Sequence, residues 1–200
     1  MSTAAAPVRS GAVLADLLPS ASTATRAFAR DAALVLGGAA LTGIAAQIAV
    51  PVPGSPVPVT GQTFAALLVG TAVGARRGFL SLAVYAVIGM AGMPWFAGGT
   101  SGAGGASFGY ILGMLLAATV VGALARRGGD RSVLRTAGTM VLGSAVIYAV
   151  GVPYLALSTG MSLSAAVAAG LVPFLIGDAL KAALAMGALP AAWKLVGDRG

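Results

Sequence analysis

Three residue types with reactive side chains are missing from this chain of 200 residues: it contains no cysteine, no histidine and no glutamate. Without cysteine there are no disulfides and no thiol nucleophiles. Without histidine the chain lacks imidazole acid–base chemistry and a common transition-metal ligand. Its carboxylate side chains are five aspartates. We therefore expect no metal site, no cofactor and no enzymatic activity.

Charge is scarce as well, because only 8% of the residues are charged while 58% are hydrophobic. A soluble domain has about a quarter of its residues charged, so this chain has too little polar surface to cover a water-facing exterior. We therefore expect an all-α protein of the lipid bilayer. The 30 glycines agree with this interpretation, because small residues let transmembrane helices approach closely.

Apolar segments follow one another along the chain, separated by charged or Pro/Gly-rich connections. They are about 32–50, 62–75, 79–93, 107–125, 134–157 and a last segment that starts near Pro173, after a short stretch at about 164–171. At roughly 20 residues per crossing, this pattern predicts six transmembrane helices in a single domain, residues 26–197. Residues 1–25 are rich in Ala, Ser and Thr and predict a disordered cytoplasmic arm.

The basic residues occur in alternate connections, whereas loops 51–61, 94–106 and 158–164 carry no charge. The basic residues in these connections are Arg26, Arg30, Arg76, Arg77, Arg126, Arg127, Arg131, Arg135, Lys194 and Arg199. The positive-inside rule then predicts a multi-pass protein of the cell membrane with both termini cytoplasmic. The net charge of +7 reports this topology, and we expect no nucleic-acid partner.

Asp178 and Lys181 are exceptions, because they lie inside the apolar run "PFLIGDALKAALAMGALP". An ionised residue at the centre of a bilayer costs at least about 2.5–3.5 kcal/mol. The two side chains share a helical face and could simply neutralise each other. Intramembrane charges more often mark a functional site. Lysine suits a carboxylate and aspartate suits N–H donors, so the pair predicts a small amphipathic anion whose N–H groups lie at a distance from its charge.

Two outer segments add candidates to this site. In "PVPGSPVPVTGQTF" the prolines indicate a stiff loop that ends at Thr60 and Gln62. Thr60 is equally suited to cap the next helix, whereas a buried Gln62 amide without a partner would be costly. Tyr110 follows the second outer loop and either faces a ligand or belongs to an interfacial aromatic belt. Tyr148 is chosen as a polar aromatic residue on the outer half of the fifth segment.

The enzyme classes that suit a membrane are excluded by the missing residues. The stretch "GTSG" contains Ser101, but no histidine is present to activate it. An intramembrane aspartyl protease needs two carboxylates, and only Asp178 lies inside an expected span. Neither lysine occurs in a GxxxxGK[ST] motif, so a transporter with this sequence cannot itself hydrolyse ATP.

Taken in order, "VPVTGQTFAALLVGTAVGARRGFLSLAVYAVIGMAGMPWFAGG", "SFGYILG" and "PFLIGDALKAALA" resemble BioY, the biotin-specific substrate-binding S component of energy-coupling factor (ECF) transporters. The resemblance covers roughly residues 28–190. It implies that Asp178 meets the ureido ring of biotin, that Lys181 meets the valerate carboxylate, and that the loop bearing Thr60 and Gln62 acts as a lid.

The resemblance also implies partners, namely a transmembrane coupling subunit and cytosolic ATPase subunits. The coupling surface of the family lies on a first helix with small-residue spacing, for which Ala29 and Ala33 are the candidates here. One departure concerns the turn before Tyr110, where "GASFGY" replaces the family's Gly-Pro-Thr-Gly-Gly-Tyr. There the Ser107 hydroxyl could replace that of a threonine.

Two alternatives to the ECF interpretation stay open at this point. The first is an autonomous secondary biotin transporter that acts alone or as a homo-oligomer, which the small-residue stripes permit. The second is a structural membrane protein in which Asp178 and Lys181 only neutralise each other.

Overall fold

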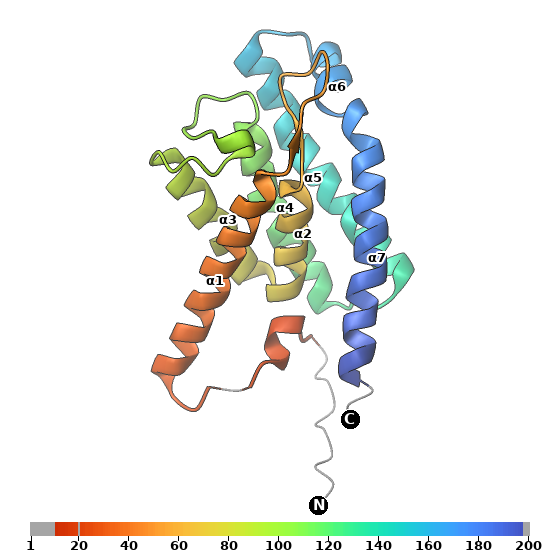
Figure 1. The fold of residues 1–200 in the computed structure, drawn as a ribbon. Helices are drawn as coiled ribbons and strands as arrows, with labels where there is room; N and C mark the ends of the chain where they lie inside the picture. Colours follow the sequence, from red (N-terminus) through yellow and green to blue (C-terminus); the bar gives the residue numbers. More distant parts are fainter. Residues whose placement is uncertain (1–10, 20, 198–200) are drawn as a thin grey trace, which may run out of the picture.

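The computed structural model describes residues 11–19 and 21–197, which form a mainly helical bundle (Figure 1). In chain order the elements are η1 (Leu14–Leu17), α1 (Ala24–Ala46), β1 (Ala49–Val50), β2 (Val59–Thr60), α2 (Gln62–Val73), α3 (Ala75–Met90), η2 (Ala97–Gly99), α4 (Phe108–Arg126), α5 (Val133–Thr159), α6 (Leu163–Gly170), η3 (Val172–Phe174) and α7 (Leu175–Gly197).

Four helical stretches of the described chain are long and apolar enough to cross a membrane. They are α1, α4, α5 and the stretch from Leu163 to Leu195, which joins α6 to α7. Helix α2 is equally apolar but shorter, with 12 residues. The expected all-α membrane class is therefore confirmed at this level.

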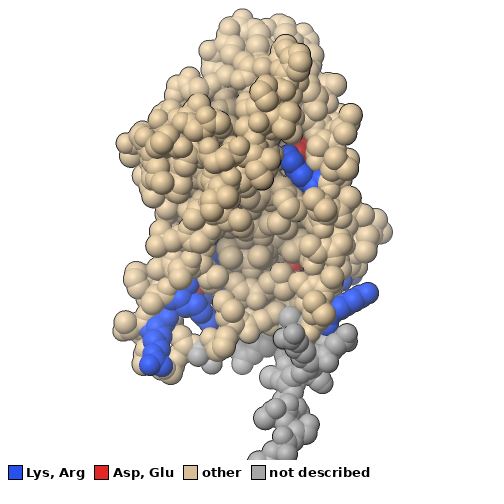
Figure 2. Space-filling model, viewed as in Figure 1, with Lys and Arg blue, Asp and Glu red and all other residues tan. Residues whose placement is uncertain are grey.

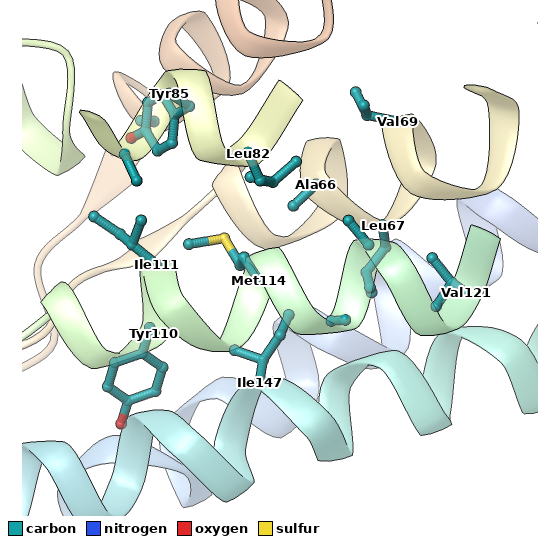
Figure 3. Close-up of a cluster of buried hydrophobic side chains, with 14 of the residues drawn as sticks. Ala66, Leu67, Val69, Leu82, Tyr85, Tyr110, Ile111, Met114, Val121 and Ile147 are labelled. Carbon is teal, nitrogen blue, oxygen red and sulfur yellow. The ribbon is translucent and has the colours of Figure 1, made fainter. Parts of the chain in front are cut away.

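Helix α4 lies at the centre of the bundle, with α2, α3 and α5 packed against it (Figure 1). Glycine allows the close approach. A Cβ at Gly70 of α2 would lie 2.5 Å from the carbonyl oxygen of Ala118 on α4. Figure 3 shows the buried side chains that fill the space between these helices, among them Leu67, Met114 and Ile147.

The described chain has a basic end and a loop end. The basic end carries η1, the α2–α3 turn, the α4–α5 connection and the last turns of α7 (Figure 1). In Figure 2 the blue side chains on the visible face gather here, apart from one blue spot beside a red one higher up. The loop end carries residues 51–61, 91–107 and 160–162, which contain no charged residue.

Two helix boundaries differ from the sequence expectation. The first expected span was about 32–50, but α1 begins at Ala24, because the Thr23 hydroxyl accepts the backbone N–H of Arg26 and caps the helix. It ends before residue 50 because β1 pairs with β2 in a short antiparallel hairpin. Helices α2 and α3 are separated by Gly74, whose φ of 85° favours glycine.

Residues 11–19 fall in the segment expected to be a disordered arm, and they pack against the basic end. Val13 is fully buried. The Asp16 carboxylate lies 3.0 Å from Arg77 Nη1 and 3.5 Å from Arg126 Nη1. Burial alone would raise the pKa of Asp16, but these two arginines and the backbone N–H of Val13 lower it below its ordinary value. Residues 1–10 of the expected arm lie outside the described residues.

Helix α7 lies at the periphery of the bundle and exposes most of its apolar side chains, including Leu180 and Leu184 (Figure 1). A groove of about 640 Å³ runs between α5 and α7 and is lined mainly by apolar residues. The helix that carries Asp178 and Lys181 therefore makes limited lateral contact with the bundle.

Candidate functional site

One cavity at the loop end brings together all seven residues that the sequence nominated for binding. It lies beneath the β1–β2 hairpin and between α2, α4, α5 and α7. Its lining residues are Val57, Pro58, Thr60, Gln62, Thr63, Ala97, Ser107, Tyr110, Met114, Tyr148, Phe174, Asp178 and Lys181. The nominated residues come from four helices and two loops, so it is the fold that assembles them.

The two intramembrane charges lie at the wall of this cavity and contact each other. Lys181 Nζ lies 3.2 Å from Asp178 Oδ1 and donates a 2.8 Å hydrogen bond to Thr63 Oγ1 on α2. The hydroxyl of Tyr148 on α5 donates to Asp178 Oδ2. Asp178 and Lys181 thus contact each other on α7, and each also has a hydrogen-bond partner on another helix. This compensates part of the cost of placing charge in an apolar region.

Gln62 is a buried polar residue of the cavity whose side-chain amide has an unsatisfied hydrogen-bond donor. Its side chain is 4% exposed, and its Nε2 has no hydrogen-bond partner among the described residues. A buried amide donor without an acceptor is unfavourable by about 1–3 kcal/mol. The amide is therefore suited to a ligand that brings an acceptor oxygen into the cavity.

The hydroxyls of Tyr110, Thr60 and Ser107 differ in whether they already make hydrogen bonds within the protein. Tyr110 donates a 2.7 Å hydrogen bond to the carbonyl of Gly170, so its ring, rather than its hydroxyl, is available to a ligand. Thr60 Oγ1 accepts the backbone N–H of Gln62 at 3.3 Å, but the N-cap residue of α2 is Gly61, so Thr60 is not the cap considered from the sequence. Ser107 is the N-cap residue of α4, but its side chain makes no capping hydrogen bond. Its hydroxyl is thus free toward the cavity.

The cavity is almost closed, with about 30 Å³ of free space, which is room for about two water molecules. Val57 and Pro58 of the hairpin close it from the loop end. The hairpin, residues 49–60, is held by the two pairings Ala49–Thr60 and Val50–Val59 and by a 3.0 Å hydrogen bond from the Gly61 backbone N–H to the carbonyl of Ile48. A ligand larger than a few water molecules needs the walls of this cavity to rearrange.

The neighbouring loop, residues 91–107, is held far more firmly. Gln47 Nε2 donates to the carbonyls of Trp95 and Phe96, at 3.1 and 3.4 Å. Tyr85 and Trp95 exchange hydrogen bonds between their side chains and main-chain carbonyls. Side-chain hydrogen bonds thus tie this loop to α1 and α3, whereas those of the hairpin are local, between Ser55 and Val57 and between Thr60 and Gln62.

The site has the chemistry of a receptor for one kind of ligand. It combines an ammonium, a carboxylate and an unpaired amide donor with the apolar walls of Met114 and Phe174. Such a set suits a small anion that carries N–H donors and a carbonyl on an apolar body.

Ala29 and Ala33 lie outside this site, on the basic half of α1. Both are exposed, and Gly37, one turn further on, has no neighbouring atom within 4 Å of its Cβ position. The stripe that they form is therefore not used for packing within the described chain.

Sequence reasoning missed Thr63, the helix-to-helix partner of Lys181. Its signal was available, since Thr63 follows Gln62 directly in the first turn after the proline-rich loop. Phe174 and Met114 were also missed. They are apolar side chains in an apolar chain, and nothing in the local sequence distinguishes them from ordinary core residues.

The model of the BioY family matches residues 17–198, which is most of the chain. The chain belongs to the BioY family. The family resemblance seen in the sequence is thus confirmed, and the transporter family places the chain in a non-enzyme class of membrane proteins.

Several curated BioY relatives align over most of their length. The probable biotin transporter BioY of Pyrococcus horikoshii is 36% identical, and the alignment covers 79% of this chain and 93% of the relative. The biotin transporter BioY2 of Lactococcus lactis is 34% identical, with 76% and 83% covered. The biotin transporter BioY of Thermotoga maritima is also 34% identical, with 73% and 85% covered.

A solved structure shares the fold. The crystal structure of the S-component for biotin from an ECF-type ABC transporter superposes with a TM-score of 0.76 at 21% identity, covering 87% of this chain and 95% of the other. At that identity the match establishes the S-component fold of this BioY chain.

Proposed function

We propose that this BioY protein captures biotin at the loop end and is the membrane-embedded binding subunit of an ECF-type transporter. The observation that carries the proposal is the single cavity in which the Lys181 ammonium, the Asp178 carboxylate and the unpaired Gln62 amide meet. The names of the BioY relatives and of the matching S-component support biotin as the ligand.

Biotin offers a complement to each of these groups. Its ureido ring has two N–H donors and one carbonyl, and its valerate chain ends in a carboxylate. Asp178 accepts from the ureido N–H groups, Gln62 Nε2 donates to the ureido carbonyl, and Lys181 binds the carboxylate. The walls made by Tyr110, Met114 and Phe174 cover the apolar body. The hairpin of residues 49–60 acts as the lid.

The proposal includes the full topology, with six transmembrane helices and both termini in the cytoplasm. The gathering of arginines at the basic end supports this orientation, because cytoplasmic loops carry an excess of Lys and Arg. In six spans α2 and α3 each cross once, and α6, η3 and α7 together form the last crossing. The loop end then faces outward, where the lid meets its substrate.

Energy for uptake comes from separate subunits in this proposal, since the chain contains no ATP-binding motif. A transmembrane coupling subunit contacts the exposed stripe of Ala29 and Ala33 on α1, and cytosolic ATPase subunits act through it. Exposed small residues support this assignment because they let another membrane helix approach closely.

Biotin binding to the purified protein, measured by calorimetry in detergent, tests the proposal. We expect binding by the wild type and strong loss in both Asp178→Asn and Lys181→Ala. Lys194→Ala is the matched control, because it removes the other, exposed lysine at the basic end. A wild-type protein that ignores biotin would refute the substrate. Normal binding by both site variants would show that the pair is structural.

A further inference from the structure

Thr63 differs from most helical threonines that make a side-chain hydrogen bond in the described chain, although Thr139 of α5 also bonds outside its own helix, to the carbonyl of Gly129. The hydroxyls of Thr42, Thr71, Thr119 and Thr159 each donate to the carbonyl four residues earlier in their own helix. Thr63 lies in the first turn of α2, where the residue four positions back belongs to β2 rather than to the helix. Its hydroxyl is therefore released from the usual intrahelical bond.

The released hydroxyl is used as an acceptor, across a sequence separation of 118 residues. Lys181 Nζ donates to Thr63 Oγ1 at 2.8 Å, a shorter distance than the 3.2 Å to Asp178 Oδ1. In this contact the Thr63 hydroxyl accepts a hydrogen bond and does not donate one. Thr63 makes no other side-chain hydrogen bond among the described residues. A hydroxyl can donate one bond while it accepts another. Its O–H is thus available to a ligand atom placed next to the ammonium.

Thr63 also lies only two residues after Gly61, the junction between the hairpin and α2. Gly61 separates β2 from α2, and its backbone N–H donates to the carbonyl of Ile48 at 3.0 Å. Lys181 is therefore attached to the α2 turn that follows the hairpin directly.

We propose that Thr63 is a positioning residue for the anionic end of the ligand: its Oγ1 holds the Lys181 ammonium, and its O–H donates to the ligand carboxylate beside it. The inference deepens the proposed function and rests on it, since it assigns the carboxylate half of the same cavity. It makes Thr63 a determinant of selectivity for a carboxylate over a neutral group of the same shape.

The test compares biotin with biotinamide, in which a neutral carboxamide replaces the carboxylate. Thr63→Val keeps the shape and removes the hydroxyl, and we expect about 10- to 100-fold weaker binding of biotin, as for loss of a hydrogen bond to a charged group. Binding of biotinamide should change by less than about threefold. Thr63→Ser restores the hydroxyl and should restore the preference. Thr119→Val on α4 is the matched control and should alter neither affinity.

Equal loss of both ligands in Thr63→Val would overturn the inference, because it would indicate a general effect on the lid or on folding. The inference would also be overturned if Thr63→Val bound both biotin and biotinamide with the affinities of wild type.

A second readout is independent of biotin and separates this inference from the proposed function. Acylation of Lys181 by an amine-reactive reagent can be followed by mass spectrometry, with the exposed Lys194 as a reference in the same molecule. We expect Lys181 to react several-fold faster in Thr63→Val than in wild type, with Lys194 unchanged. Equal Lys181 rates would refute the positioning role even if biotin binds. If Lys181 were acylated faster in Thr63→Val but the protein did not bind biotin, the positioning role of Thr63 would be supported and the proposed substrate would be wrong.

Discussion

The indole N–H of Trp193 on α7 donates a 2.7 Å hydrogen bond to Oδ2 of Asp130, in the connection between α4 and α5. Asp130 is fully buried, and burial raises its pKa while the bond from Trp193 opposes that rise. The guanidinium of Arg131 lies 4.2 Å above the Trp193 ring. This contact fixes the basic end of α7, while Asp178 and Lys181 fix the loop end.

Trp193→Phe should lower the stability of the protein by about 1–3 kcal/mol, because the variant leaves a buried carboxylate oxygen without its donor. Phenylalanine keeps an aromatic ring for Arg131 to cover, so the loss reports mainly the hydrogen bond. Thermal unfolding in detergent measures the change. Leu195→Ala, a truncation of an exposed neighbour, is the control. Equal melting temperatures for Trp193→Phe and wild type would contradict the prediction.

Asp16 should make stability depend on pH. Its pKa is lowered in the folded protein, so the bonded carboxylate stabilises the fold above its ordinary pKa of 3.8 and loses this effect as the pH falls through the folded value. At neutral pH Asp16→Asn should therefore melt at a lower temperature than wild type. The difference in melting temperature between Asp16→Asn and wild type should narrow below about pH 4. Melting curves between pH 3 and 8 measure it, and a gap that stays constant with pH would rule out this linkage.

Close helix packing should make Gly70→Ala destabilising by about 1–3 kcal/mol. The added Cβ would lie 2.5 Å from the carbonyl oxygen of Ala118, and a backbone atom cannot easily yield. Gly187→Ala is the matched control on α7, since nothing lies within 4 Å of its Cβ position. That variant should be neutral or more stable by about 0.5–1 kcal/mol. Similar melting temperatures for the two variants would show that α2 and α4 are less closely packed.

The lid should be trappable by chemical cross-linking, in a chain that has no cysteine of its own. Pro58 and Ala97 both line the cavity of the candidate site, and both also line a second cavity at the loop end. In Pro58→Cys/Ala97→Cys, a short bifunctional thiol reagent should block biotin binding when added to the free protein. Added after biotin, it should retain the ligand instead. Each single cysteine variant controls for the reagent, and unhindered binding after cross-linking would mean that biotin enters by another route.

The stripe on α1 should be required for uptake but not for binding. Ala33→Leu places a large side chain on the exposed surface proposed for the coupling subunit, so uptake in cells with the partner subunits should fall at least about tenfold, as for loss of 1.4 kcal/mol of association. Biotin binding by the purified variant should be unchanged. Ala183→Leu, on the exposed surface of α7, is the control. Normal uptake by Ala33→Leu would place the coupling surface elsewhere.

Patterns that recur along the chain were sufficient to predict much of the fold. The expected spans 107–125 and 134–157 agree with α4 and α5 to within two residues, because long apolar runs bounded by arginines leave little freedom. Charge placement likewise predicted which connections gather at one end. The start of α1 was wrong because the expectation followed hydrophobicity, whereas the Thr23 cap begins the helix earlier, in a stretch that includes Arg26 and Arg30.

The candidate site was accessible from sequence for a different reason. Asp178 and Lys181 are chemically out of place in an apolar run, and such residues can be recognised one at a time. Their partners cannot, since Tyr148 and Thr63 come from distant helices and look ordinary in their own segments. The bond between Trp193 and Asp130 joins residues 63 positions apart, and only three-dimensional packing shows it.

The peripheral place of α7 has a consequence for the surrounding lipid. Asp178 and Lys181 are carried by a helix with several exposed apolar side chains, and the groove of about 640 Å³ beside it is lined mainly by apolar residues. We expect acyl chains to occupy this groove in a membrane. Bilayer thickness and chain order would then act on the helix proposed to meet the ligand, so we expect affinity to depend on the lipids as well as on the protein.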